Sequence, residues 1–240
     1  MYLIIKRIFK MFVLKKILIE IKNIFFGRYF IKSYSQQGED IILNKFFYQK
    51  LNGFYVDVGA HHPKRFSNTF YFYKKGWNGI NIDAMPGSMR LFDLLRPRDI
   101  NIEVPISNEQ KELNYYMFNE PALNGFSKKI SSKRNKIDSY YIISTKKLKT
   151  NTLNNVLNYN LKNNVNIDFL TIDVEGLDFE VLKSIDLKKH KPKVILIEIL
   201  NNSLESLKNN QVTIYLKQYN YSIYTRTGNT FFYIKDDFYF

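Results

Sequence analysis

The segment GFYVDVGAHHP, residues 53–63, combines a short apolar strand pattern with a turn that contains a single glycine. Short apolar runs of this kind are typical of strands buried on both faces of a parallel sheet. Gly59 allows a tight turn and the close approach of a ligand, while Asp57 and His61 place polar groups beside it. The segment therefore predicts a ligand-binding turn at the carboxyl end of the first strand of an α/β sheet.

Strand and helix patterns alternate around this segment. Apolar strands are predicted at Gly53–Val58, Gly79–Asp83, Asn101–Ile106, Ile167–Asp173 and Lys193–Leu200, with an added strand at Glu112–Phe118 and a closing hairpin of Ser222–Arg226 and Thr230–Ile234. Helices are predicted at Gln37–Tyr48, Phe66–Lys75, Ser88–Leu95, Thr152–Leu161, Leu177–Ile185 and Gln211–Tyr219, whereas residues 119–150 show no clear pattern. This alternation predicts a doubly wound α/β domain with a mostly parallel sheet, helices on both faces and an antiparallel edge.

The ends of the second and third predicted strands add candidates for a nucleoside site. Asp83 lies 24 residues after Gly59, and an acidic residue at such a spacing accepts hydrogen bonds from both ribose hydroxyls. Ala84 and Met85 are placed to flank an adenine, and Ser107 is a further candidate for its edge. A single glycine does not match the G-x-G-x-x-G pattern that cradles a pyrophosphate, so a dinucleotide and a nicotinamide enzyme are disfavoured.

S-adenosylmethionine (SAM) suits this arrangement better. It has an amino-acid end, a sulfonium and an adenosine, but no phosphate, so one glycine turn beside a carboxylate is sufficient for it. The residues predicted to contact SAM are Asp57, Gly59, Ala60, His61, Asp83, Ala84, Met85, Ser107 and Asp173.

The fourth predicted strand ends in two acidic residues, Asp173 and Glu175, which point the same way in an extended segment. Three interpretations are open. One carboxylate acts as a general base for a hydroxyl, or the pair holds Mg²⁺ or Mn²⁺, or Glu175 with Asp178 and Glu180 stabilises a helix N-terminus. His61 is a further candidate base, although histidines in loops often only bond to the backbone.

The net charge of +14 is confined to two segments. Residues 1–32 and residues 128–149 each hold eight Lys or Arg and one acid, so each carries +7 and the remainder is neutral. A nucleic acid is therefore disfavoured as the partner of the main domain. There is no cysteine, which excludes disulfides, thiolate metal sites and cysteine nucleophiles and fits a cytoplasmic protein.

Residues 1–32 are predicted to form a basic amphipathic helical segment in front of a domain that spans residues 33–240. Charges recur too often for a membrane span, and no cleavage site follows an uninterrupted apolar stretch, so a signal peptide is not expected. Such a helix suits peripheral contact with anionic lipids on the inner face of the membrane. The alternative is packing on its own domain or on a second subunit.

Over about residues 33–200, the chain resembles the FkbM-type family of SAM-dependent methyltransferases. The resemblance rests on the ordered set SQQGED (35–40), FYVDVGAH (54–61), SNT (67–69), GINID (79–83) through Pro86, and IDVEG (172–176). It implies a seven-stranded methyltransferase sheet, SAM as the cofactor, and methylation of hydroxyls on sugars, polyketides and glycan precursors. Many members have glycine where Pro63 stands, so the resemblance does not determine the path of the first loop.

The sequence thus predicts a SAM-dependent O-methyltransferase that acts on a sugar or glycan precursor of the polysaccharide, capsule or lipopolysaccharide type. A sugar hydroxyl is a weak nucleophile and needs a base or a metal, for which Asp173, Glu175 and His61 are the candidates in that order. Residues predicted to bind the acceptor are Gln36, Glu39, Ser67, Asn68 and Thr69, with Tyr115, Tyr116, Phe118 and Phe126 as possible stacking faces.

Two rival functions belong to other classes. Tyr140 and Tyr141 lie among the lysines of residues 128–149, a pattern also found in RNA-binding surfaces, which motivates a nucleic-acid methyltransferase. The other rival is a non-catalytic scaffold that keeps the sheet without binding SAM.

Overall fold

The computed structural model describes residues 2–27, 31–161, 165–200 and 206–239. The chain divides into two compact units, Met1–Ser33 and Tyr34–Phe240.

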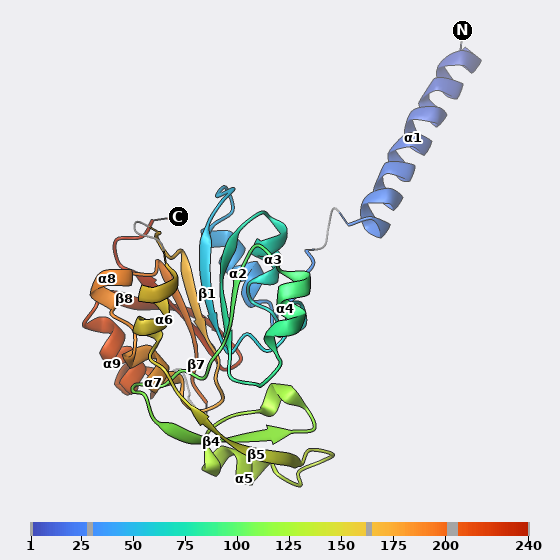
Figure 1. The fold of residues 1–240 in the computed structure, drawn as a ribbon. Helices are drawn as coiled ribbons and strands as arrows, with labels where there is room; N and C mark the ends of the chain where they lie inside the picture. The colour runs from blue at the N-terminus through green and yellow to red at the C-terminus, as the bar shows by residue number, and fades with distance from the viewer. Residues whose placement is uncertain (1, 28–30, 162–164, 201–205, 240) are drawn as a thin grey trace. The chain divides into compact units, whose positions relative to one another are not determined.

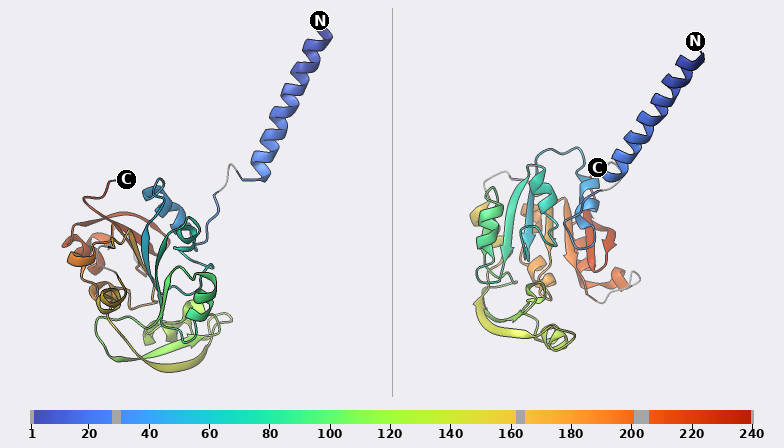
Figure 2. Two further views of the ribbon diagram at one scale, coloured as in Figure 1. Left: turned by 45° about the horizontal axis from the view of Figure 1, so that its top comes forward. Right: turned by 90° about the vertical axis from the view of Figure 1, so that its right-hand side faces the viewer.

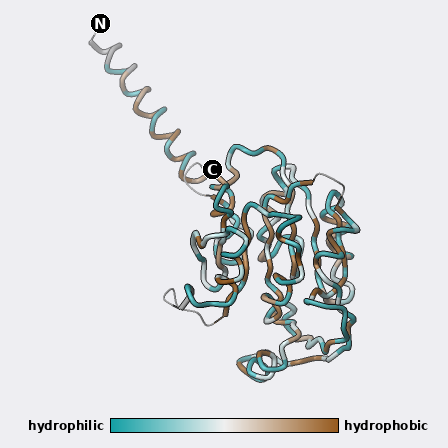
Figure 3. The backbone as a smooth tube through the Cα atoms, turned by 90° about the vertical axis from the view of Figure 1, so that its left-hand side faces the viewer, coloured by the Kyte–Doolittle hydropathy of each residue, from teal (hydrophilic) through white to brown (hydrophobic). Residues whose placement is uncertain are grey.

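The first unit consists of helix α1, Tyr2–Phe25, which is followed by Gly27 with a positive φ of 93°. The described large apolar side chains from Phe9 to Phe25 are exposed, including Phe12 at 73% and Leu18 at 62%. Apolar and polar residues follow one another along the helix, as the mixture of teal and brown along α1 in Figure 3 shows, and they do not separate into two faces. The helix forms as predicted, but the prediction that it is amphipathic is wrong, because successive basic residues turn to different sides at about 100° per residue. Across the described residues, no helix combines the length and the apolar character that crossing a bilayer requires.

The second unit is built on a seven-stranded sheet with the order β3-β2-β1-β6-β7-β9-β8 (Figure 1). The strands are β1 Phe54–Val58, β2 Asn78–Asp83, β3 Ile100–Glu103, β6 Phe169–Ile172, β7 Val194–Glu198, β8 Tyr221–Thr227 and β9 Thr230–Lys235. β1, β2, β3, β6 and β7 are parallel, whereas β9 pairs antiparallel with β7 and with β8. This confirms the predicted α/β architecture and its antiparallel edge, and the chain order reverses between β1 and β6.

Helices cover both faces of this sheet (Figure 2). Leu43 and Phe72 pack with Tyr55 on one face, whereas Leu157 and Leu182 pack with Val56 on the other. Adjacent residues of β1 thus enter opposite cores, as the two-residue repeat of a strand requires. The helices are α2 Glu39–Phe46, α3 Phe70–Lys74, α4 Met89–Leu95, α6 Leu153–Asn160, α7 Asp178–Lys183, α8 Leu187–His190, η2 Ser206–Asn209 and α9 Gln211–Lys217.

Residues 112–149 form an insertion with its own two-stranded antiparallel sheet. It comprises β4 Glu112–Phe118, η1 Pro121–Leu123, α5 Lys128–Arg134 and β5 Ile142–Lys149. The sequence predicts β4 as an added strand but gives no indication of α5 or β5. β5 is rich in lysine, and its extended form is fixed by pairing with β4, from Glu112 opposite Lys149 to Phe118 opposite Ile142. Figure 1 shows the insertion across the lower end of the main sheet.

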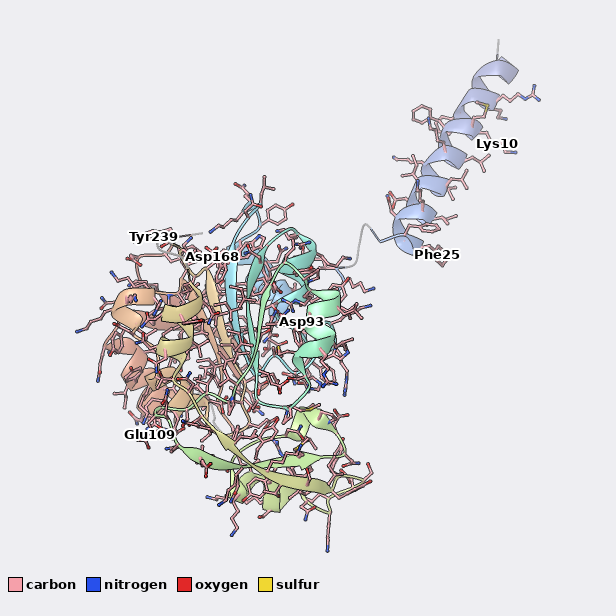
Figure 4. The ribbon with its side chains drawn as sticks, in the orientation of Figure 1. Lys10, Phe25, Asp93, Glu109, Asp168 and Tyr239 are labelled. Carbon is pink, nitrogen blue, oxygen red and sulfur yellow. The ribbon has the colours of Figure 1, made fainter. Side chains whose placement is uncertain are left out.

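The amino end of the sheet is held together by Asp168, which lies at the edge away from the insertion (Figure 4). Its carboxylate accepts hydrogen bonds from the Phe54 N–H at 3.0 Å and from Lys193 Nζ at 2.9 Å, and it also pairs with Lys50. This ion cluster joins the amino ends of β1, β6 and β7. A ligand can therefore bind at the opposite end of the sheet, where the carboxyl ends of the strands lie.

Candidate functional site

A cavity of about 320 Å³ lies at the carboxyl ends of β1, β2, β6 and β7. That volume is at the lower end of the range for small-molecule sites, about 300–1,000 Å³. Residues of the insertion and of the turn between β8 and β9 complete its walls. Of the residues predicted for the site, those that line the cavity are Gln36, Glu39, Gly59, His61, Asn68, Asp83, Ala84, Met85, Asp173 and Glu175.

The turn after β1 depends on glycine for two reasons. Gly59 has a positive φ of 87°, and a Cβ at this position would lie 1.7 Å from the carbonyl oxygen of Asp173. The Gly59 N–H donates to the Ile82 carbonyl at 2.9 Å, and the Asp173 N–H donates to the Val58 carbonyl at 2.9 Å. The ends of β1, β2 and β6 therefore converge on this one residue, and a side chain there would push them apart.

Asp83 links the loops that follow β1 and β2. Its carboxylate accepts the His61 N–H at 2.8 Å and the Met85 N–H at 2.7 Å. Burial raises the pKa of Asp83, and these two backbone hydrogen bonds oppose that rise. A carboxylate offers about four lone-pair sites, so Asp83 can also accept a hydrogen bond from a ligand hydroxyl while the loops stay fixed.

Three residues predicted for the site belong to a buried cluster beside the sheet instead. Asp57 accepts a hydrogen bond from the Thr69 hydroxyl at 2.9 Å, and Arg96 donates to Thr69 at 3.0 Å and to Ser67 at 3.4 Å. Arg96 also pairs with Asp99 at 2.7 Å, and both side chains are fully buried. Asp57, Ser67 and Thr69 do not line the cavity, because Asp57 points to the same face as Tyr55 and not toward the strand ends. Burial raises the pKa of Asp57 to about 6.

Ala60 and Ser107 also lie outside the cavity wall. Ala60 packs against Met89 and Phe92 of α4, and the Ser107 hydroxyl donates to Asn108 at 3.2 Å. The segment just before Ser107, Val104 to Ile106, supplies an apolar wall in its place.

Three carboxylates gather at the ends of β6 and β7. Oxygens of Asp173, Glu175 and Glu198 lie within 4.8 Å of one another. Asp173 and Glu175 are predicted from the sequence, whereas Glu198 is not; it is the last residue of β7, at the carboxyl end of that apolar strand. The pattern in the sequence that could have identified Glu198 is a charged residue at the end of a buried apolar strand.

The pKa values of these acids are shifted upward. Asp173 opens onto the cavity, yet the surrounding protein limits its hydration, so burial and the nearby Glu198 and Glu175 raise its pKa. Burial, with Glu175 and Asp178, raises the pKa of Glu198 to about 8, and one of its oxygens is buried without a hydrogen-bond partner in the described part of the chain. Like charges this close cannot all ionise at neutral pH, so the cluster can hold and release protons.

The insertion contributes Arg134, which sequence reasoning misses. Arg134 Nη1 donates to Glu175 Oε2 at 2.6 Å, and the side chains are 25% and 16% exposed. Glu175 has a positive φ of 54°, and a Cβ on Gly125 would approach its carbonyl oxygen to 2.9 Å. Because the ion pair joins residues 41 apart in the sequence, its formation depends on the position of the insertion. Burial still raises the pKa of Glu175, although Arg134 opposes the rise.

The acids around the fourth strand end therefore have separate roles. Asp178 accepts the N–H groups of Val174 at 2.9 Å and Gly176 at 3.0 Å, and so stabilises the loop before α7. Burial raises the pKa of Asp178 to about 6. Glu175 faces the cavity instead. The predicted structural interpretation thus fits the position of Asp178 but not that of Glu175.

His61 also faces the cavity. Its Nε2 atom is buried and has no hydrogen-bond partner among the described residues, and its ring stacks on Phe66 with centroids 6.4 Å apart. Burial and the nearby Arg65 lower the pKa of His61, so the imidazole is neutral near pH 7. Arg65 in turn forms two 3.1 Å hydrogen bonds with Glu120, which connect this loop to the insertion.

The remaining walls are polar on one side and aromatic on the other. In the polar wall, Gln37 and Glu39 contact the β8–β9 turn. The Thr227 hydroxyl donates a hydrogen bond to Glu39. Gly228 lies so close to Gln37 that an added Cβ would be 1.9 Å from the Gln37 amide oxygen. Asn229 and Thr230 of this turn line the cavity. The aromatic wall consists of Tyr115 and Phe126, with ring centroids 4.8 Å apart. The two other predicted stacking residues, Tyr116 and Phe118, do not line the cavity.

Comparison with known proteins agrees with this geometry. A family model described as the methyltransferase FkbM domain matches residues 57–223, which is more than half of the chain. Comparisons with curated proteins and with solved structures gave no significant match. The match includes the turn after β1, the carboxylate cluster and the insertion, and it confirms the resemblance noted in the sequence. The chain therefore belongs to the FkbM family of methyltransferases.

Proposed function

We propose that this methyltransferase transfers the methyl group of SAM to a hydroxyl oxygen of a sugar or glycan precursor. The observation that carries the proposal is the carboxylate cluster of Asp173, Glu175 and Glu198, which lies beside the tight turn at Gly59. The turn gives a ligand access to the strand ends, and the cluster supplies groups that accept a proton from a hydroxyl.

The chemistry of the cavity fits SAM. Asp83 has lone pairs available for the ribose hydroxyls, and the wall formed by Met85, Val104 and Ile106 is apolar enough for an adenine. The acidic lining favours a ligand with a positively charged sulfonium and ammonium. When bound, SAM supplies a methyl group that is already electrophilic. The buried, unpartnered Nε2 of His61 offers a further hydrogen-bonding atom to a ligand in this cavity.

The protein's own residues would orient the acceptor and take its proton. Amide groups of Gln36, Asn68 and Asn229 line the cavity and can hold hydroxyls. A carboxylate of the cluster, with Asp173 as the first candidate, accepts the proton of the attacking hydroxyl as the new carbon–oxygen bond forms. Correct placement brings the oxygen to about 3–3.5 Å from the methyl carbon, in line with the bond that breaks. Residues of the insertion line one side of the cavity, where they would limit the access of water to bound ligands.

The same three carboxylates suit a divalent cation such as Mg²⁺ or Mn²⁺, since hard cations prefer oxygen ligands. A bound ion would lower the pKa of the acceptor hydroxyl in place of a carboxylate base. Methylation measured with and without chelator, for the wild type and Asp173→Asn, separates the two mechanisms. Full turnover of Asp173→Asn under both conditions would exclude both mechanisms for that residue.

The placement of SAM is tested at Asp83. The substitution Asp83→Asn retains the size of the side chain but removes its charge, and it is expected to weaken SAM binding about tenfold or more because the ribose hydroxyls lose a charged acceptor. Isothermal titration calorimetry with SAM measures the change, with Asp93→Asn on α4 as a matched control outside the cavity (Figure 4). Unchanged affinity in Asp83→Asn would refute this placement of the ribose. Mass spectrometry of candidate nucleotide-sugars and lipid-linked glycans after incubation with SAM then identifies the acceptor.

Two rival functions have their own tests. The lysines of α5 and β5, with the exposed Tyr140 and Tyr141, favour RNA as an alternative acceptor, and salt-dependent RNA binding would support it. The five acids of the cavity weigh against a phosphate backbone running through it. A scaffold without catalysis predicts no thermal stabilisation by SAM, whereas an enzyme predicts a clear shift.

Helix α1 provides a separate proposal, peripheral contact with the cytoplasmic face of a membrane. Its apolar and basic side chains do not form separate faces, so the proposal depends on the exposed apolar side chains and on the attraction of its lysines to anionic lipids. The paired substitution Phe12→Glu and Leu18→Glu is expected to reduce co-sedimentation with vesicles containing phosphatidylglycerol. Equal sedimentation of the variant and the wild type would refute this contact.

A further inference from the structure

The charge of the cavity is opposite to that of the chain. Five carboxylates line it, and Arg134 is the single Lys or Arg side chain among the described lining residues. The chain as a whole carries +14. The net charge of the chain therefore does not predict the charge of the ligand that this cavity accepts. The five acids are Glu39, Asp83, Asp173, Glu175 and Glu198.

Neither Arg134 nor His61 is available to receive an anion. Arg134 is held by Glu175 at 2.6 Å, so binding an anion would leave that carboxylate without its counter-charge. His61 has a pKa lowered by burial and by Arg65, and its neutral ring adds no positive charge. A bound cofactor with one net positive charge would balance the negative charge of about one of the four carboxylates that Arg134 does not pair with.

The other polar groups of the lining are uncharged and suit hydroxyls. Amides of Gln36, Gln37, Asn68 and Asn229, with the Thr230 hydroxyl, offer both donors and acceptors. The carboxylates add acceptors alone while they are ionised. A ligand that donates many hydrogen bonds and carries no negative charge matches this set, and the Tyr115–Phe126 pair adds an aromatic face for the apolar side of a ring.

We infer that the acceptor group admitted to this cavity is an uncharged polyhydroxylated ring, a neutral sugar without phosphate, carboxylate or sulfate on the reacting residue. The inference rests on the proposed function and narrows its acceptor class. An anionic substituent would lie close to several carboxylates, and like charges in such contact are strongly unfavourable. A phosphate carried elsewhere on the acceptor would have to remain outside the cavity.

The test compares matched neutral and anionic sugars that differ at one carbon. Methyl α-glucoside and methyl α-glucuronide, and the corresponding galactose pair, are titrated into the full-length protein with and without S-adenosylhomocysteine. Binding is followed by saturation-transfer difference NMR, which needs no turnover. At least one neutral sugar is expected to bind at least about tenfold more tightly than its uronic acid, which corresponds to about 1.4 kcal/mol.

Charge variants show whether the cavity causes this preference. The double substitution Asp173→Asn with Glu198→Gln removes two of the three acidic groups of the cluster, together with the negative charge that they share, and is expected to reduce the preference to less than about threefold. Glu109→Gln is the control, because Glu109 is exposed and lies outside the cavity (Figure 4). Circular dichroism confirms that each variant is folded, and Glu198→Gln alone serves as a second variant if the double one is not.

The outcomes separate the two proposals. A uronic acid that binds as tightly as its neutral partner, or the absence of binding by either neutral sugar, overturns the inference. A preference that persists unchanged in the charge variants also overturns it. Failure of the wild type to bind SAM by calorimetry refutes the proposed function instead, and the sugar titrations made without cofactor still test the charge preference.

Discussion

Replacement of Glu198 by glutamine is expected to stabilise the protein at pH 8 and to change its stability little at pH 5. Burial raises the pKa of Glu198 from 4.5 to about 8. Because the folded-state pKa is the higher one, the folded protein retains a proton that the unfolded chain has released. The stability contributed by this proton is present below about pH 4.5 and is lost as the pH rises toward 8.

The size of the effect follows from the same shift. Each pKa unit corresponds to about 1.4 kcal/mol, so the full shift sets an upper limit of about 5 kcal/mol. Glu198 shares its proton with Asp173 and Glu175 and is partly exposed to the cavity, so we reduce the expectation to about 2 kcal/mol. For a domain of this size, about 2 kcal/mol moves Tm by about 4–8 °C.

Urea unfolding of the full-length wild type and of Glu198→Gln between pH 5 and pH 8 measures this difference. The buffer contains EDTA, because a divalent cation on the cluster would neutralise the same charges. The wild type is expected to lose about 2 kcal/mol more than the variant over this range. The exposed Glu109→Gln is the control and should follow the wild type. Parallel pH profiles for the wild type and Glu198→Gln would refute the reasoning.

Two further substitutions test how the strand ends and the insertion are held together. Gly59→Ala is expected to cost at least about 3 kcal/mol of unfolding free energy and to abolish SAM binding, because its Cβ would collide with the Asp173 carbonyl. Gly87→Ala is the control, since Gly87 has a similar φ of 85° but no atom within 4 Å of the added Cβ. It should cost about 1–2 kcal/mol, and urea unfolding measures both variants. A similar loss in both would show that the contact is unimportant. Arg134→Met is expected to lower the unfolding free energy by about 2 kcal/mol and to leave Glu175 without its counter-charge, whereas Arg134→Lys retains part of the ion pair. Equal thermal stability of Arg134→Met, Arg134→Lys and the wild type would contradict an energetic role for this pair.

Local patterns were sufficient to predict the main sheet. Strands such as β1 and β6 are apolar runs bounded by turn residues, and their burial on both faces makes that pattern visible without tertiary information. The glycine turn and the acids at the carboxyl ends of β2 and β6 were predicted for a related reason. Parallel strands bring their carboxyl ends to the same edge, so Gly59, Asp83 and Asp173 had to lie near one another once the sheet was assumed.

Local sequence patterns did not predict the structure of the insertion, nor on which face of the sheet a given side chain lies. β5 is Lys-rich and is a strand because β4 pairs with it, and Arg134 reaches Glu175 only after the insertion has docked. Asp57 was expected in the cavity but faces Thr69 and Arg96, since a shift of one residue along a strand moves a side chain to the other face.

The sequence by itself determined which strands form the main sheet and that Asp83, Asp173 and Glu175 stand near the carboxyl ends of those strands, because strand periodicity and glycine conformation are local properties of the chain. Only the tertiary structure decided that Glu198 joins Asp173 and Glu175, that Arg134 balances one of them, and that a strongly basic chain encloses an acidic cavity. Electrostatic interactions depend on distances between residues that lie far apart in the sequence, and those distances exist only in the folded molecule.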